Sequence, residues 1–453
     1  MAGTTLWFEH GLTAAGWARG VRISVADGRI ARLETGVEAD GAERHGIAVP
    51  GLPNLHSHAF QRAMAGLTEV RGPAGDSFWT WRELMYRFGE RLGPEELEAV
   101  AALAFAEMLE RGFTRVGEFH YLHHDEGGRP FADPAEMSAR IAAAAQATGI
   151  GLTLLPVFYA HSGFGGAAPT PAQARFVHDP DGYGRLVEAA RLAVRPLGDA
   201  VVGVAPHSLR AVTEDELRAV ADLGDGPVHI HIAEQVREVD DCLAWSGARP
   251  VEWLLDRFGV GEAWCLVHAT HMTAEETRRL ARSGAVAGLC PVTEANLGDG
   301  IFPADAYLAD GGRFGVGSDS NVRIDAAEEL RMLEYSQRLG LKARNVLARG
   351  EGSSTGADLF RGALTGGARA LGVPAAEGLA EGGPADIVAL SADHPDLAGR
   401  SGDQWLDSWV FAAGGAAVAD VWRAGEHVVQ GGRHRARDGI EARYRQALAR
   451  LTA

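Results

Sequence analysis

The sequence predicts an α/β protein whose main domain is a (β/α)8 barrel. Strand-like and helix-like segments alternate at roughly 25 to 40 residues per unit, as expected of βα repeats. Metal-binding side chains end four of the strand-like runs: His56 with His58, His231, His268 and Asp319. Barrel enzymes carry their chemistry at the C-terminal ends of the strands, so these residues predict one catalytic face.

Eight strand-like runs are expected in the barrel. The first is the run before His56, which contains the apolar stretch 47–49 and its Pro-Gly break. The others are 114–121, 151–160, 201–207, 227–233, 265–270, 285–291 and 314–319. Helix signals lie between them. Thr213 with Glu216 and Thr273 with Glu276 have capping-box spacing, while Pro134 can open a helix and Gly149 can close one.

The two chain ends predict a second, smaller domain. Residues 4–49 contain short alternating strands with a hairpin signal at Asp27-Gly28. Residues 385–390 and 419–424 also have strand character, and Gly425-Glu426 is expected to turn before the strand at 428–429. We therefore expect residues 1–49 and 382–453 to pair into a small β-sandwich beside a barrel formed by residues 50–381.

Composition indicates a cytoplasmic enzyme. Hydrophobic residues make up 46% of the 453 residues, yet no apolar run approaches the ~18 residues of a membrane span, and the N-terminus lacks a signal-peptide pattern. The scattered Cys242, Cys265 and Cys290 fit reduced, buried thiols. A net charge of -17 argues against nucleic acid or an anionic membrane as partner. A homodimer is expected, although the sequence leaves the oligomeric state open.

Four residues are candidate ligands of one zinc ion: His56, His58, His231 and Asp319. Residues two apart on a strand share a face, so His56 and His58 can reach one metal, and zinc prefers imidazole and carboxylate ligands. A His-x-His pair can equally be two packed histidines, and His229 shares the strand face of His231; we prefer His231 because it lies nearer the end of its strand. Asp319 could instead cap a helix, but its tight Gly-x-Gly-Ser-Asp turn at a strand end favours ligation.

Two further residues suit the chemistry of a metal-bound water. His268 could hold that water, or it could be a strand-end histidine bonded to the backbone. Glu234 lies three residues beyond His231, where the chain leaves its strand. It could be an ordinary surface glutamate, or it could carry a proton from the attacking water to a leaving nitrogen.

These motifs resemble the amidohydrolase superfamily, in its mononuclear, adenosine-deaminase-like branch. Within that branch the chain is similar to the formimidoylglutamate deiminases of bacterial histidine degradation, through segments 54–62, 78–82, 117–121, 205–210 and 229–235. The resemblance implies metal-dependent deamination of N-formimino-L-glutamate to N-formyl-L-glutamate and ammonia, with Glu234, His268 and Asp319 as catalytic residues. One Zn2+ per chain is expected, although Fe2+ or Mn2+ can occupy such sites. Barrel hydrolases with two metals use a bridging lysine, and the only lysine, Lys342, follows Asp319.

The implied substrate is a small dicarboxylate, and the sequence offers candidate partners for it. Arg82 and Arg210 can recognise carboxylates bidentately from strand-end loops. Gln61, Tyr121 and His207 also lie at strand ends. Two alternatives stay open: a deaminase of an aromatic ring such as guanine or a triazine on the same scaffold, and a non-catalytic barrel. No presumed ligand is missing, as the second alternative would require.

Overall fold

The computed structural model describes residues 4–72 and 75–452 and contains the expected barrel. Parallel pairing connects one group of strands in the order β5-β6-β7-β8, with β9 also on β7, and a second group in the order β10-β11-β12-β13. Single bridges close the ring, from Val204 to Val228, from Ser208 to His231 and from Ser57 to Asp319. The strands are β5 (Leu52–Ser57), β6 (Phe113–His120), β7 (Gly151–Phe158), β8 (Val201–Val202), β9 (Ala205–Pro206), β10 (Val228–Ile232), β11 (Trp264–His268), β12 (Val286–Leu289) and β13 (Arg313–Val316).

Each expected strand run is found, with two differences. The run expected at 201–207 is divided into β8 and β9 around Gly203, where a Cβ atom would lie 2.4 Å from the Pro227 carbonyl oxygen. The apolar stretch 47–49 belongs to the terminal sheet as part of β4 (Arg44–Pro50), so the barrel strand that carries His56 begins only at Leu52. Gly51 allows this passage, because a Cβ atom there would overlap the Thr114 side chain.

Helices surround the barrel, and their ends follow the expected signals. Thr213 and Thr273 cap α5 and α8 in capping boxes with Glu216 and Glu276. Gly149 ends α3 in the left-handed conformation, but α3 begins at Glu136, two residues beyond Pro134. The helices are α1 (Phe78–Gly89), α2 (Pro94–Glu110), α3 (Glu136–Thr148), α4 (Pro180–Ala193), α5 (Glu214–Ala221), α6 (Val236–Ser246), α7 (Pro250–Arg257), α8 (Ala274–Ser283), α9 (Pro291–Leu297), α10 (Ala304–Ala309), α11 (Ala326–Leu341) and α12 (Thr355–Ala370).

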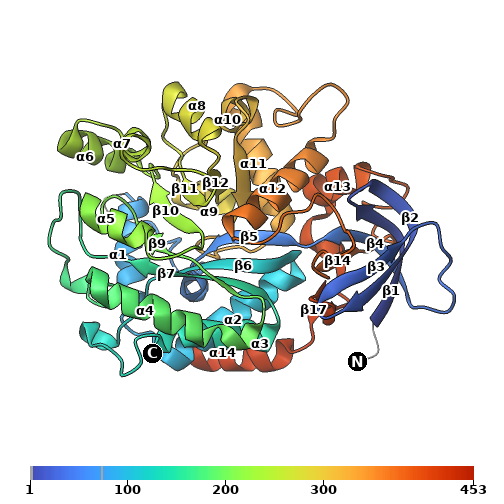
Figure 1. Ribbon diagram of the computed structural model, residues 1–453, viewed down its shortest axis with the longest axis horizontal. Helices are drawn as coiled ribbons and strands as arrows, with labels where there is room; N and C mark the ends of the chain where they lie inside the picture. Colours follow the sequence, from blue (N-terminus) through green and yellow to red (C-terminus); the bar gives the residue numbers. More distant parts are fainter. Residues whose placement is uncertain (1–3, 73–74, 453) are drawn as a thin grey trace.

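The two chain ends form one sheet beside the barrel (Figure 1). Its strand order is β17-β16-β15-β14-β4-β1-β2-β3, so strands from both ends pair where β14 meets β4. The sheet curls so that the turn between β15 and β16 approaches β2, since a Cβ atom on Gly425 would lie 2.3 Å from Val25. The remaining strands are β1 (Thr4–Thr13), β2 (Gly16–Ala26), β3 (Arg29–Glu34), β14 (Ile387–Leu390), β15 (Val418–Arg423), β16 (Glu426–Gln430) and β17 (Arg433–His434).

Turn residues fix two of the hairpins of this sheet. Asp27 and Gly28 both have positive φ, 49° and 74°, which matches the twist that a two-residue hairpin needs. The second turn is formed by Ala424 and Gly425, with φ of 49° and 76°. The expected turn at Gly425-Glu426 is therefore wrong by one residue, and Glu426 is the first residue of β16.

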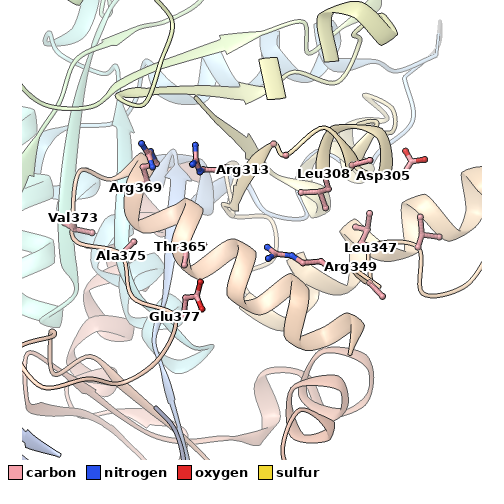
Figure 2. A pocket seen from close by; sticks show the side chains of 15 residues that line it. Asp305, Leu308, Arg313, Leu347, Arg349, Thr365, Arg369, Val373, Ala375 and Glu377 are labelled. Carbon is pink, nitrogen blue, oxygen red and sulfur yellow. The ribbon is translucent and has the colours of Figure 1, made fainter. Parts of the chain in front are cut away.

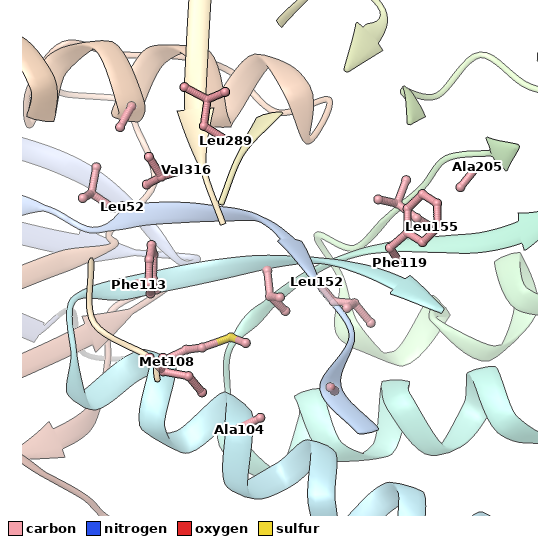
Figure 3. Packing of buried hydrophobic residues seen from close by; sticks show 14 of the residues in the cluster. Leu52, Ala104, Met108, Phe113, Phe119, Leu152, Leu155, Ala205, Leu289 and Val316 are labelled. Carbon is pink, nitrogen blue, oxygen red and sulfur yellow. The ribbon is translucent and has the colours of Figure 1, made fainter. Parts of the chain in front are cut away.

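Buried apolar side chains hold the barrel and its helices together (Figure 3). Phe113 and Leu152 on the strands and Met108 and Ala104 on α2 belong to one cluster with almost no exposed surface. The C-terminal helix α14 (Arg437–Thr452) lies beside α2, and Arg437 donates to Glu110 at 2.9 Å. Of the described helices, none is both long and apolar enough to cross a membrane.

Candidate active site

The four residues expected to bind metal converge at the C-terminal ends of β5, β10 and β13. The Nε2 atom of His56 lies 3.2 Å from that of His58 and 3.1 Å from that of His231. Asp319 Oδ1 lies 3.3 Å from His58 Nε2 and 3.6 Å from His56 Nε2. All four side chains are buried. Residues separated by more than 260 positions in the sequence thus present their donor atoms to one point.

The histidine rings are oriented in a way that fits a cation. His58 Nδ1 lies 2.9 Å from the Phe119 carbonyl oxygen and His231 Nδ1 lies 3.0 Å from that of His207, so these nitrogens carry the ring hydrogens. The Nε2 lone pairs then face one another. Burial lowers the pKa of His58 to about 3 and, with the neighbouring histidines, holds the pKa values of His56 and His231 well below their usual range. Neutral rings with converging lone pairs, two of them fixed by a carbonyl, form the donor set of a zinc-type site.

His229, the alternative to His231, lies outside this cluster. Its Nε2 atom lies 2.7 Å from the carbonyl oxygen of Ala370, at the end of α12, and the side chain is fully buried. His229 and His231 are two residues apart on β10, so their side chains point to the same face of the strand. His229 lies two residues farther from the C-terminal end of the strand and is therefore deeper in the barrel. The depth of each residue along the strand therefore separates them.

The backbone of Asp319 adopts a left-handed conformation within a tight turn. Its φ is 45°, in the left-handed region that non-glycine residues rarely adopt. The turn is fixed from both sides, because Asp319 N donates to the His56 carbonyl oxygen at 3.0 Å and His58 N donates to that of Asp319 at 2.8 Å. Burial raises the pKa of the Asp319 carboxyl to about 7, although the His268 imidazole opposes that rise.

His268 is held between carboxylates. Its Nδ1 atom lies 3.2 Å from Glu294 Oε1, and its Nε2 atom lies 3.8 Å from Glu234 Oε1 and 3.9 Å from Asp319 Oδ2. Burial alone would lower the pKa of His268, but Glu234, Glu294 and Asp319 raise it to about 10. Glu294 was not predicted from the sequence; its signal is an acidic residue on α9, directly after the seventh barrel strand β12.

Glu234 is placed by another glutamate. Glu238, fully buried in the first turn of α6, accepts hydrogen bonds from the backbone nitrogens of Ala233 and Glu234, both at 3.2 Å. Ala233 has a φ of 51°, so the chain leaves β10 sharply. Glu238 therefore fixes the turn that directs the Glu234 side chain toward His268.

The residues expected to bind substrate line one pocket with these groups. Gln61, Arg82, Tyr121, His207 and Arg210 all border it, together with His58, His231, Glu234, His268 and Asp319. Gln61 Nε2 donates to the Tyr121 hydroxyl at 2.9 Å. The sequence reasoning missed several aromatic lining residues, which come from α1 and from loops at the barrel mouth: Phe78, Trp81, Tyr86, Tyr159 and Phe176.

Arginines gather at the outer end of this pocket. The guanidinium carbons of Arg82, Arg237 and Arg210 lie 4.6, 4.8 and 5.7 Å from the centre of the Trp79 ring. Arg210 is only 7% exposed, and its Nε atom has no hydrogen-bond partner among the described residues. Three cations around one ring make this mouth locally attractive to anions despite the net charge of -17.

A larger hollow lies at the opposite end of the barrel (Figure 2). It is bordered by Arg313 at the start of β13, by Arg369 near the end of α12, and by Asp305, Arg349 and Glu377. In barrels, this N-terminal end of the strands serves stability rather than chemistry. The smaller pocket at the C-terminal ends therefore holds the candidate active site.

A barrel whose strand ends bring three histidines and an aspartate together defines the class of protein, and sequence comparison agrees. The chain belongs to the amidohydrolase family, whose profile matches residues 47–428. Residues 4–46 match the profile described as the N-terminal domain of formimidoylglutamate deiminase HutF.

The similarity to particular relatives extends over the whole chain. The chain is 52% identical over 452 residues to formimidoylglutamate deiminase of Pseudomonas aeruginosa, covering 99% of both proteins. It is 30% identical to the 8-oxoguanine deaminase of the same organism, covering 94% of this chain and 93% of that one. A solved amidohydrolase from Brucella melitensis is 57% identical with a TM-score of 0.95, covering 99% of this chain and 100% of its own. A zinc-bound adenosine deaminase from Xanthomonas campestris, at 23% identity and a TM-score of 0.80 over 99% and 98% of the two chains, shares the fold.

Proposed function

We propose that this chain hydrolyses N-formimino-L-glutamate to N-formyl-L-glutamate and ammonia, as a metal-dependent deiminase of histidine degradation. The observation that carries this proposal is the 52% identity over 99% of both chains to a formimidoylglutamate deiminase. The pocket supports it, because a proton carrier and a candidate metal centre lie at its inner end and arginines lie at its outer end.

We assign one divalent ion, preferably zinc, to His56, His58, His231 and Asp319. A bound divalent ion would lower the pKa of a coordinated water toward ~7 and so supply the nucleophile. The bridging lysine of a two-metal site is absent, since Lys342 is exposed at the end of α11. Iron or manganese would suit the same ligands.

The chain's own residues handle the protons. Asp319 and His268 face the attacking oxygen; Asp319 accepts its proton, and the charged His268 holds the oxygen over the formimino carbon. The oxygen adds as a hydroxyl to the carbon of the protonated formimino group, and the π electrons of the C=N bond move to the terminal nitrogen. Glu234 then carries the hydroxyl proton to that nitrogen. The bond from carbon to that nitrogen then breaks, ammonia leaves, and the carbon retains the oxygen as a formyl group.

Carboxylate recognition falls to the outer end of the pocket. Arg82 and Arg210 are assigned to the two carboxylates of the substrate, with Gln61, Tyr121 and His207 as neutral partners. This division places the formimino head beside Glu234 and the glutamyl tail toward the barrel mouth. We propose that the enzyme works as a cytoplasmic homodimer with residues 50–381 as its catalytic domain.

The test is a substrate panel with product identification. Purified enzyme with one zinc per chain should release ammonia from N-formimino-L-glutamate and leave N-formyl-L-glutamate, which mass spectrometry distinguishes from glutamate plus formamide. Guanine and 8-oxoguanine serve as competitors, because the 30% identical relative is named as an 8-oxoguanine deaminase. Faster turnover of either ring than of any formimino acid would replace the substrate and leave the deaminase chemistry in place.

A further inference from the structure

The barrel closes where its last strand, β13, meets its first strand, β5, and this seam carries the candidate metal ligands. Neighbouring strands such as β12 and β13 pair over four residues, whereas within the described residues β13 and β5 share a single bridge, between Ser57 and Asp319. His56 and His58 flank Ser57 at the end of β5. The position of the Asp319 carboxylate relative to the two histidines therefore depends on a short contact.

Gly317 lets the two strands approach closely at the seam. A Cβ atom there would lie 2.6 Å from the His56 carbonyl oxygen and 2.7 Å from the His56 nitrogen, so any side chain would push β13 away from β5. The following residue, Ser318, consequently lies within hydrogen-bonding distance of Asn54 on β5.

Four buried polar side chains form a chain of hydrogen bonds across the seam. The Asn54 amide holds Ser318 twice, since Oδ1 accepts from Ser318 N at 3.0 Å and Nδ2 donates to Ser318 Oγ at 2.6 Å. Ser318 Oγ donates to Asn321 Oδ1 at 2.6 Å. Asn321 Nδ2 then donates to Ser57 Oγ at 3.1 Å and to the Asp319 carbonyl oxygen at 3.0 Å. Each of these four side chains is at most 1% exposed.

The direction of every hydrogen bond in this chain is fixed. The backbone nitrogen of Ser318 can only donate, so the Asn54 atom that faces it must be the amide oxygen, and the Asn54 nitrogen must donate to Ser318 Oγ. A hydroxyl has one hydrogen, which Ser318 therefore directs to the Asn321 oxygen. The Asn321 nitrogen is then left to donate to Ser57 and Asp319. Reversing either amide would leave buried donors and acceptors unpaired, so the network has a single arrangement.

We propose that Asn321, fixed by Asn54 through Ser318, is a positioning residue for the Asp319 carboxylate. Asp319 and Asn321 have φ values of 45° and 55°, a backbone conformation that costs free energy and persists only where contacts hold it. Asn321 supplies such contacts to both sides of the seam, at the Asp319 carbonyl oxygen and at Ser57. This role rests on the proposed function, in which Asp319 binds the ion and accepts the proton of the attacking oxygen.

The test measures how firmly the ion is held, separately from turnover. Asn321→Gly removes the amide and tolerates the positive φ, so it loosens the seam without straining the backbone. Release of zinc from the loaded protein to a chelator should become about tenfold faster or more, the usual cost of losing a hydrogen-bond partner behind a ligand. kcat per bound ion should fall by about tenfold or more while KM changes by less than about twofold, because the arginines assigned to the substrate carboxylates lie at the outer end of the pocket.

Asn345 offers a matched control for this substitution. It has a similar φ of 52° but lies exposed beyond α11, away from the seam. Asn345→Gly should therefore change neither the rate of zinc release nor the kinetic constants.

A second variant breaks the same chain at its centre. Ser318→Ala removes the hydroxyl that joins Asn54 to Asn321 and should give the same pattern; it decides alone if Asn321→Gly does not fold, as judged by circular dichroism. Unchanged zinc release and unchanged kcat per bound ion, even with a lower Tm, would make the network purely structural and overturn the proposal. A rise in KM alone would overturn it as well.

Failure of the proposed function would look different. Absence of turnover by the unsubstituted, zinc-loaded protein would overturn the proposed substrate, whereas the rates of zinc release would still decide the role of Asn321. A chain that binds no divalent ion would overturn both.

Discussion

Glu294 Oε1 lies 3.2 Å from His268 Nδ1, and the same oxygen accepts a hydrogen bond from Cys290 N at 2.9 Å. The carboxylate therefore both orients the ring and stabilises its charge. Because the second ring nitrogen, Nε2, faces Glu234 and Asp319, this pair connects α9 to the catalytic groups.

Glu294→Gln should lower kcat/KM by about tenfold to a hundredfold, because the imidazolium of His268 loses its buried partner. Metal content should stay the same, since Glu294 is not among the proposed ligands. Steady-state kinetics with elemental analysis checks both statements. Glu275→Gln, an exposed position on α8, is the matched control and should be neutral.

Glu234→Gln should keep the shape of the side chain but remove the proton carrier. We expect kcat to fall by ~10²-fold or more while the metal stays bound. Retained activity would move the acid and base role to another residue. Loss of metal in this variant would make Glu234 a structural residue.

The two histidines of β10 provide a matched pair for the metal site. His231→Ala should lose the bound ion and all turnover, because one of three converging Nε2 atoms is removed. His229→Gln should keep one ion per chain, since an amide can still donate to the Ala370 carbonyl oxygen. Elemental analysis of purified protein decides; two ions per active chain would contradict the one-metal site.

Arg82→Met and Arg210→Met should each weaken turnover of N-formimino-L-glutamate. A charge-assisted contact worth ~2 to 4 kcal/mol corresponds to a loss of roughly 30-fold to 1000-fold in kcat/KM. Both variants should also discriminate poorly against analogues that lack one carboxylate. Unchanged kinetics in both variants would show that the dicarboxylate pocket is wrongly placed.

The ion pairs of Asp199 should make part of the folding stability depend on pH. It accepts from Arg115 of β6 at 2.6 Å and from Arg423 of β15 at 2.5 Å, and so joins the barrel to the terminal sheet. Burial favours a higher pKa for Asp199, but Arg423 and Arg115 outweigh it and hold the pKa below its usual value. A lowered pKa in the folded state stabilises the fold above the unfolded value of ~3.9, and this contribution disappears as pH falls through the folded value.

Asp199→Asn should therefore cost about 1 kcal/mol of unfolding free energy at pH 7, a modest figure because the carboxylate is half exposed. Urea denaturation at pH 7 measures it. The difference between the two proteins should shrink as the pH is lowered below ~3.5. A difference that does not depend on pH would mean that packing, and not charge, explains the loss.

The order of the elements was readable from the sequence because its signals are local. Strand periodicity, the capping boxes at Thr213 and Thr273 and the Asp27-Gly28 turn each depend on residues a few positions apart. At the β4 to β5 passage the outcome depended on which sheet the strand joins, and no local pattern carries that information. At the second turn the error was one residue, because the non-glycine Ala424 takes a positive φ there.

The candidate site also contains some residues that the sequence predicts and others that it does not. Residues at strand ends, such as His56, His231 and Asp319, could be proposed from the sequence because parallel strands in a barrel bring their C-terminal ends to one face. Glu294 could not, since its importance arises from the approach of α9, which follows β12, to His268 at the end of β11. The sequence by itself determined the type of barrel and the candidate metal-binding residues. Only the tertiary structure decided the surroundings of His268, because the charge that a buried group feels depends on which distant side chains lie beside it.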